Sequence, residues 1–230
     1  MPLRVIAAPL MWTGLEPPLP SRETCVVAGG RTIRILHPTD IDGLIRDASE
    51  EKELPFWAYV WPAGVSLARF ILEGPGANVE GQVLALELGT GVGLVGIAAR
   101  LAGWRVIQTD LAPLSTTYAR LNSRLNGVDY SGFIGDWRRL GLRGRFDRIL
   151  AADILYEPTL HDAVEQILIA HLFPHGSALI ADPCRDYGLD FMAGLERRGW
   201  RIEAHNSPPD PNDDARIVTY EAHPPSETRA

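Results

Sequence analysis

Apolar and polar positions along the chain form two regular patterns from residue 83 onward. Short apolar runs of strand length alternate with segments whose apolar residues recur at helical spacing, which predicts alternating strands and helices. This alternation is typical of an α/β fold with a mostly parallel sheet and helices on both faces. The runs at 201–205 and 217–222 have only a polar loop between them, so we expect a C-terminal antiparallel hairpin. The other expected strands are 83–88, 105–109, 132–135, 147–154 and 178–181, and the expected helices are 94–102, a segment through Leu125, 160–172 and 191–198.

The beginning of the chain does not follow this pattern and reads as a lead-in segment. Two β-prone runs, 24–28 and 32–37, flank a pair of glycines and predict a hairpin, whereas 40–54 predicts a short helix or loop. The stretch PFWAYVWPAG at 55–64 places three aromatic side chains before a helix that Pro62 begins. These aromatics either pack in the core or line a ligand site. The expected division of the chain is a hairpin and lead-in at 1–54, one α/β domain at 55–223 and a flexible tail at 224–230.

Composition and charge exclude several classes of function. The chain has 230 residues, enough for a sizeable core, and its net charge of −7 gives no field that attracts a phosphate backbone. We therefore expect no nucleic-acid partner. No apolar run reaches membrane-spanning length, so we expect no membrane partner either. The two cysteines, Cys25 and Cys184, suffice for neither a disulfide framework nor a metal site, and we expect a cytoplasmic protein without bound metal.

The most informative stretch is VLALELGTGVGLVGIAA at 83–99. An apolar strand breaks into glycines at Gly89, Gly91 and Gly93 and continues as a helix of small and apolar residues. Glycines let a ligand approach the backbone closely, and the start of a helix offers free N–H groups. Because open α/β sheets bind ligands at the carboxyl ends of their strands, we expect a nucleotide-like ligand here.

Two kinds of nucleotide fit this turn. The spacing of Gly91, Gly93 and Gly96, with Asp110 19 residues after Gly91, matches the fingerprint of a nicotinamide dinucleotide site. The alternative ligand is S-adenosylmethionine, which has no pyrophosphate. In that case Glu87 attracts the amino group, directly or through water, and Asp110 accepts hydrogen bonds from the ribose hydroxyls.

A third acid follows the next strand along the chain. Asp136, with Trp137 beside it, would then hold the edge and the face of an adenine ring. Each acid also has a plain structural reading, Glu87 as a hydrogen-bonded acid in a turn, Asp110 as a helix cap and Asp136 as a loop residue. Three acids at the carboxyl ends of successive strands favour S-adenosylmethionine over a nicotinamide cofactor.

These residues resemble a known family. The motif ELGTGVG at 87–93, with Asp110 downstream, is similar to motif I and its partner acid in class I (seven-β-strand) methyltransferases. Trp61-Pro62-Ala63 resembles the tryptophan-containing segment that precedes motif I in the seven-strand protein-lysine methyltransferases. ADILY at 152–156 resembles the D-x-x-Y motif of the same enzymes.

A finer resemblance points to one branch of that family. PFWAYVWPAG at 55–64 and Ala181-Asp182-Pro183 are similar to the branch that methylates the β subunit of electron-transfer flavoprotein. Cys184 stands where that branch usually has glycine.

The resemblance implies a fold, a cofactor and a set of site residues. The fold is a Rossmann-like class I methyltransferase domain at 55–223, with a mostly parallel seven-stranded sheet that ends in an antiparallel hairpin. S-adenosyl-L-methionine is the implied cofactor. Asp153 would orient the amine of an acceptor lysine, and Tyr156 would line the lysine channel. The residues implied at the cofactor are Trp61, Glu87, Gly89, Thr90, Gly91, Gly93, Asp110, Leu111, Asp136, Trp137 and Ala152.

The expected activity is S-adenosylmethionine-dependent N-methylation of a protein lysine, with the electron-transfer flavoprotein β subunit as the leading substrate. The sequence DILY at 153–156 lacks the proline pair of N/D-P-P-Y/F motifs, which argues against a nucleobase or amide acceptor. Three alternatives stay open: a small-molecule amine as the acceptor, a nicotinamide-dependent enzyme, and a module that binds cofactor without turnover.

Overall fold

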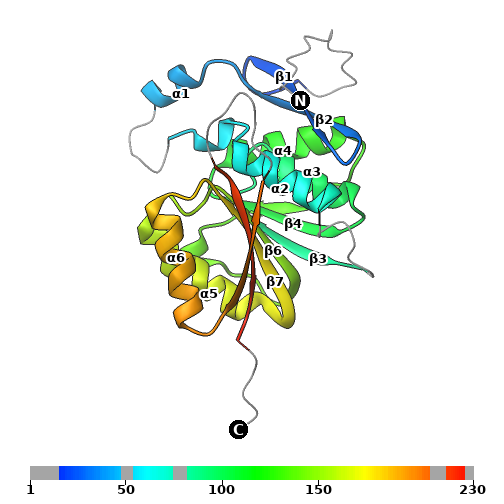
Figure 1. The fold of residues 1–230 in the computed structure, drawn as a ribbon. Helices are drawn as coiled ribbons and strands as arrows, with labels where there is room; N and C mark the ends of the chain where they lie inside the picture. Colours follow the sequence, from blue (N-terminus) through cyan, green and yellow to red (C-terminus); the bar gives the residue numbers. More distant parts are fainter. Residues whose placement is uncertain (1–15, 48–53, 75–81, 208–215, 226–230) are drawn as a thin grey trace.

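A mixed seven-stranded sheet forms the centre of the protein. The computed structural model describes residues 16–47, 54–74, 82–207 and 216–225. In these segments the strand order of the main sheet is β5-β4-β3-β6-β7-β9-β8, and β9 runs antiparallel to both of its neighbours (Figure 1). The strands are β3 (Leu84–Leu88), β4 (Arg105–Asp110), β5 (Gly132–Ile134), β6 (Phe146–Ala152), β7 (Leu172–Asp182), β8 (Arg201–Asn206) and β9 (Val218–His223). The predicted terminal hairpin is confirmed.

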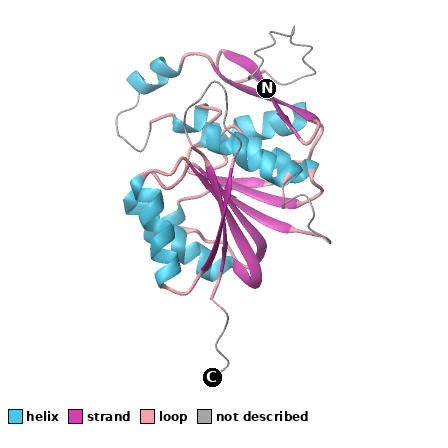
Figure 2. Ribbon diagram, in the orientation of Figure 1, coloured by secondary structure: helices cyan, strands magenta, loops and turns pink. Residues whose placement is uncertain are grey.

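Helices cover the sheet on both sides, as the sequence pattern predicts (Figures 1 and 2). One face carries α2 (Pro62–Glu73), α3 (Leu94–Leu101) and α4 (Pro113–Leu125). The other face carries α5 (His161–His171) and α6 (Asp186–Arg197). Proline occupies the first turn of both α2 and α4, where its missing N–H has no helical partner to lose.

The central strands are buried on both faces, which explains their unbroken apolar sequence. On β3, Leu86 and Leu88 pack with Ile149 of β6 in the cluster that α5 and α6 cover. Ala85 of β3 and Leu150 of β6 face the opposite cluster, with α2 and α3. Each of these five side chains is fully buried.

A separate two-stranded hairpin, β1 (Ser21–Ala28) and β2 (Arg31–Pro38), packs against the helices α2, α3 and α4 (Figure 1). The edge of β2 that does not pair with β1 is bonded by two asparagine side chains, one on α4 and one on the residue that caps the C-terminus of α4. The Asn122 amide accepts from Leu36 N at 2.8 Å and donates to Leu36 O at 2.9 Å.

The second side chain repeats this arrangement one helical turn later. The Asn126 amide accepts from Arg34 N at 2.9 Å and donates to Arg34 O at 2.7 Å. Asn122 also donates to Val92 O at 2.8 Å, in the glycine turn. The hairpin is thereby tied both to α4 and to the turn that the ligand is expected to approach.

Three elements begin at least three residues earlier than the sequence pattern predicts. Strand β1 starts at Ser21, three residues before the predicted run 24–28. Strand β7 starts at Leu172, where α5 ends, because a register shift against β6 accommodates the residues between Leu172 and Ser177. Proline and glycine at 174 and 176 interrupt the apolar run that the prediction follows. Helix α6 starts at Asp186, five residues before the prediction, since most of its first turn is exposed and lacks apolar periodicity.

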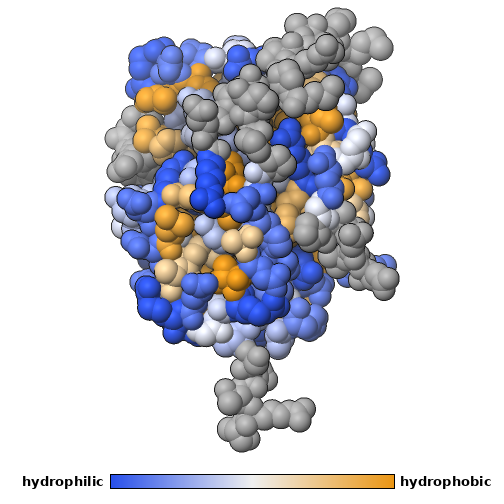
Figure 3. All heavy atoms as spheres, in the orientation of Figure 1, coloured by the Kyte–Doolittle hydropathy of each residue, from blue (hydrophilic) through white to orange (hydrophobic). Residues whose placement is uncertain are grey.

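The rest of the lead-in is described only in part. Helix α1 (Ile41–Asp47) lies within the segment predicted as a short helix or loop. Residues 1–15, 48–53 and 226–230, which include much of the expected lead-in and tail, lie outside the described residues. Among the described helices, none combines the length and apolar character that crossing a bilayer needs. Hydrophilic side chains dominate the face shown in Figure 3, and apolar residues there form small separate groups.

Candidate functional site

The glycine turn between β3 and α3 is shaped by close contacts of its backbone. Gly91 and Gly93 have φ of 53° and 93°, a region that side chains disfavour. A Cβ at Gly93 would lie 2.8 Å from the Cα of Ala119 on α4, and one at Gly91 would lie 3.3 Å from Trp57 O. Glycine is therefore required here both by conformation and by the approach of neighbouring backbone.

Glu87 lies behind this turn and is completely buried. Its Oε2 accepts from Thr90 Oγ1 at 3.0 Å and from Gln108 Nε2 at 2.9 Å. Burial raises the pKa of Glu87 to about 8, and the hydrogen bonds from Gln108, Thr90 and the Gly96 backbone oppose the rise. The structure thus places Glu87 and Thr90 in one network with Gln108, a residue that sequence reasoning missed.

Asp110 ends β4 and holds the glycine turn from the other side. Its Oδ2 accepts from Gly91 N at 2.9 Å, and its Oδ1 accepts from Ala112 N at 3.0 Å. Burial raises the pKa of Asp110, opposed chiefly by these backbone hydrogen bonds. Ala112 is the N-cap of α4 and no described side chain caps this helix, so Asp110 binds the residue before the helix and is not the helix cap of the structural reading. The side chain of the neighbouring Leu111 is exposed.

Asp136 and Trp137 follow β5, and the Trp137 ring meets the same turn. Asp136 Oδ1 accepts from Arg138 N at 3.0 Å and caps the short 3-10 helix Trp137–Arg139. A Cβ at Gly89 would lie 3.4 Å from the Trp137 ring and 3.0 Å from Ile154. The Trp137 Nε1 is buried and finds no hydrogen-bond partner in the described part of the chain.

The aromatic segment before α2 divides between core and surface. Trp57 packs on the buried Tyr118 ring of α4, with centroids 5.5 Å apart. The Trp61 Nε1 donates to Phe56 O at 2.8 Å, and the Trp61 ring lies 5.1 Å from that of the exposed Tyr59. These two contacts of Trp61 are therefore with residues of its own segment.

The end of β6 carries the two expected catalytic residues. Asp153 follows Ala152 and has a left-handed φ of 56°, a conformation that is strained for a residue with a side chain. Its backbone N–H donates to Ala181 O at 2.9 Å. Tyr156 is 42% exposed and meets Phe56 edge to face at 5.4 Å between centroids. Burial and the charges of nearby carboxylates, Asp110 first among them, raise the pKa of Tyr156. Ile154, next to Asp153, borders the glycine turn at Gly89, so the two halves of the candidate site adjoin.

An ion pair occupies the Asp153 carboxylate. The Arg185 guanidinium contacts it, and the Asp153 side chain is only 6% exposed whereas that of Arg185 is 40% exposed. Arg185 follows Cys184, the second non-glycine residue with left-handed φ, at 60°. Arg185 N also donates to Asp182 Oδ1 at 3.1 Å. The sequence analysis named Asp182 as part of the motif Ala181-Asp182-Pro183. Arg185 lies two residues beyond that motif, so no sequence pattern identified it.

Comparison with known proteins places this site in a family. The model of a family described as lysine methyltransferase matches residues 46–197, about two thirds of the chain. The chain belongs to the lysine methyltransferase family. This match begins before the aromatic segment and ends at the last residue of α6, so it covers every residue of the candidate site.

Two relatives from this family show the extent of the likeness. The electron transfer flavoprotein beta subunit lysine methyltransferase of Mus musculus is 34% identical over 133 residues, 57% of this chain and 51% of that protein. The chain thus spans about half the length of that relative. The protein N-lysine methyltransferase METTL21A of Danio rerio is 35% identical over 171 residues, 70% of this chain and 77% of that protein.

A solved structure agrees with the family's fold. The ribosomal protein L11 methylase of Lactobacillus delbrueckii subsp. bulgaricus superimposes with a TM-score of 0.54 at 25% identity, covering 69% of this chain and 77% of the other. The prediction of a Rossmann-like class I methyltransferase fold is confirmed.

Proposed function

We propose that this lysine methyltransferase family member transfers a methyl group from S-adenosylmethionine to the side-chain amine of a protein lysine. The observation that carries the proposal is the nearly buried Asp153 carboxylate, which already holds a cation beside the glycine turn. A lysine ammonium presents the same charge to that carboxylate. The family relationship supports the reaction class.

The residues around the turn fit the proposed cofactor. Each Asp110 oxygen accepts one backbone hydrogen bond and retains capacity for a ribose hydroxyl. The Trp137 ring borders the turn at Gly89, and its buried Nε1, without a partner among the described residues, can donate to a ligand. The carboxylate of Glu87 lies behind the turn, so we propose that it acts by fixing Thr90 and the turn backbone.

When bound, this cofactor supplies a methyl group on a sulfonium, whose carbon–sulfur bond breaks as the carbon–nitrogen bond to the amine forms. The protein's share is alignment and exclusion of water. Asp153 binds the incoming ammonium, directs it and accepts one of its protons, because an ammonium has no lone pair and the neutral amine must form before it attacks. We propose that Tyr156, three residues after Asp153 and packed edge to face on Phe56, lines the lysine channel and limits access of water.

Arg185 gives this proposal a specific consequence. Its guanidinium contacts the carboxylate that the acceptor would use, so the two cations compete for Asp153. Because Arg185 is 40% exposed, it can turn toward solvent at a modest energetic cost.

We propose the β subunit of electron-transfer flavoprotein as the acceptor, because relatives of this chain are named for methylating it. A small-molecule amine is the alternative acceptor. We also propose a cytoplasmic location, supported by the two cysteines, both of which have free thiols.

Methyl transfer from labelled S-adenosylmethionine into a lysate of the source cells tests the proposal. We expect one labelled protein that is absent with Asp153→Asn and retained with Asp186→Asn, an exposed acid on α6. Label confined to small molecules would replace the protein acceptor by an amine. Thermal stabilisation by NAD but not by S-adenosylhomocysteine would refute the cofactor assignment.

A further inference from the structure

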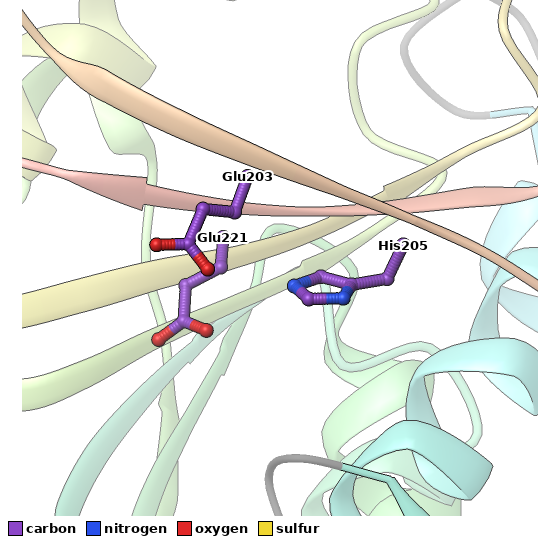
Figure 4. A group of neighbouring side chains, drawn as sticks. All are labelled: Glu203, His205 and Glu221. Carbon is purple, nitrogen blue, oxygen red and sulfur yellow. The ribbon is translucent and has the colours of Figure 1, made fainter.

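A cluster of potential metal ligands lies on the C-terminal hairpin, outside the site described above. Antiparallel pairing sets Glu203 of β8 directly opposite Glu221 of β9, and Arg201 opposite His223. Residues two apart in a strand share a face, so His205 lies on the same side as Glu203. Figure 4 shows the His205 ring pointing toward the two glutamates.

The distances within this cluster suit a single ion. One ligand atom each from Glu203, His205 and Glu221 lie within 4.8 Å of one another. His223 Nε2 lies 3.7 Å from Glu221 Oε1 and 3.9 Å from Glu203 Oε1. Ligands around a tetrahedral zinc ion stand about 3.4 Å apart, given metal–ligand bonds of about 2.0 Å. Adjustments of side-chain rotamers would therefore close the site without moving the strands.

His205 supplies an independent observation that points to a ligand. Its Nε2 is buried and lacks a hydrogen-bond partner among the residues that the structure describes. The ring packs against Phe70 of α2 at 5.0 Å between centroids, which fixes its direction. A buried imidazole nitrogen without a partner is costly, and a metal ion would satisfy it.

The two glutamates also favour a bound cation at this position. Like charges directly opposite each other in a β-ladder destabilise the pair. One carboxylate oxygen of each is held by a neighbour, since Arg201 contacts Glu203 and Ser177 Oγ donates to Glu221 Oε1 at 2.7 Å. A hydrogen-bonding partner such as Ser177 commonly orients a carboxylate that binds metal, whereas Arg201 is a cation that competes with a metal for Glu203. Arg201 is 63% exposed and can leave Glu203 when a cation arrives.

We propose that Glu203, His205 and Glu221 bind a divalent transition-metal cation of the zinc class, with His223 as a fourth ligand. A mixed set of imidazole and carboxylate donors favours zinc and its neighbours over Mg²⁺ or Ca²⁺, which prefer six or more oxygens. All of these ligands come from β8 and β9, and neither strand contributes a residue to the candidate methyl-transfer site described above. The ion would tie the edge strand β8 to β9, independently of methyl transfer.

Zn²⁺ titration of the chelator-treated full chain, by calorimetry and thermal unfolding, tests this site. We expect one Zn²⁺ per chain and a raised midpoint of unfolding. His205→Gln should weaken Zn²⁺ binding at least about tenfold, whereas His171→Gln on α5 should leave it unchanged. Arg201→Gln should strengthen binding, because it removes the competing cation.

Other outcomes would overturn the proposal. Absence of stoichiometric binding, or equal losses in His205→Gln and His171→Gln, would show that no ion binds at the hairpin. Equal affinity for Ca²⁺ would refute the zinc-class assignment. Co²⁺ provides a check within the folded protein, since a four-coordinate site with imidazole ligands gives an intense visible absorption that Glu203→Gln should abolish. Binding of S-adenosylhomocysteine by each variant confirms that it is folded.

Discussion

The buried Glu87 makes a quantitative prediction about stability and pH. Glu87 has an ordinary pKa of 4.5, and burial raises that pKa to about 8 in the folded protein. Between these values the folded state keeps a proton that the unfolded state has released. The stabilisation from this proton is complete below pH 4.5 and is lost as the pH rises toward 8.

The size of the effect follows from the shift. One pKa unit corresponds to about 1.4 kcal/mol, so titration of Glu87 lowers the free energy of unfolding by about 3–4 kcal/mol between pH 5 and pH 8. Glu87→Gln keeps the shape of the side chain but cannot titrate. Between pH 5 and pH 8 the free energy of unfolding of the variant should therefore fall by about 3–4 kcal/mol less than that of the natural protein.

Urea unfolding at pH 5, 6, 7 and 8, at constant ionic strength, measures this difference. Asp110 and Asp182 also have pKa values raised by burial and add to the pH dependence of both proteins, and the charge of Asp110 is the smallest of the causes that shift the pKa of Glu87. Glu196→Gln, at an exposed position on α6, serves as the control and should follow the natural protein. Equal pH slopes for the natural protein and Glu87→Gln would refute the argument that Glu87 is protonated at neutral pH.

Four further substitutions test the site and its support. Asp110→Ala should weaken S-adenosylhomocysteine binding by about 1.5–3 kcal/mol in calorimetry, and unchanged affinity would remove the ribose role. Trp137→Ala should weaken S-adenosylhomocysteine binding about tenfold, whereas unaltered binding would show that the Trp137 ring only packs in the protein. Arg185→Gln should lower the KM for the acceptor by about 1.4- to 5-fold, and an unchanged KM would exclude competition for Asp153. Asn122→Ala should destabilise the protein by about 3 kcal/mol in urea unfolding, because buried backbone groups lose partners, and a loss below about 1 kcal/mol would contradict this.

Local sequence signals were sufficient for most of the fold. The strand–glycine–helix unit around Gly89 combines a buried run, a turn and a helical period, and each of these has its own pattern. The start of β7 was missed because its early residues are held by a register shift against β6, which is a tertiary effect. The start of α6 was missed because Asp186 and Tyr187 are exposed and follow no apolar period.

The candidate site was predictable only where motifs mark it. Gln108 reads as one polar residue in an apolar strand, and its contact with Glu87 depends on the pairing of β3 with β4. Arg185 is 32 residues from Asp153 and meets it only because β6 and β7 are neighbours. The carboxylate–imidazole cluster on the C-terminal hairpin likewise depends on strand register, which brings Glu203 and Glu221 together.

Asn122 on α4 and Asn126 at its C-cap let the end of a helix act as a third strand of the N-terminal hairpin. Four residues of α-helix rise about 6.0 Å, and two residues of a strand rise about 6.6 Å. Asn122 and Asn126 therefore match the spacing of Leu36 and Arg34 along β2. An open strand edge invites pairing with other chains, and here two amide side chains close it. A single-residue insertion between them would rotate the second amide by about 100° and reopen that edge to aggregation.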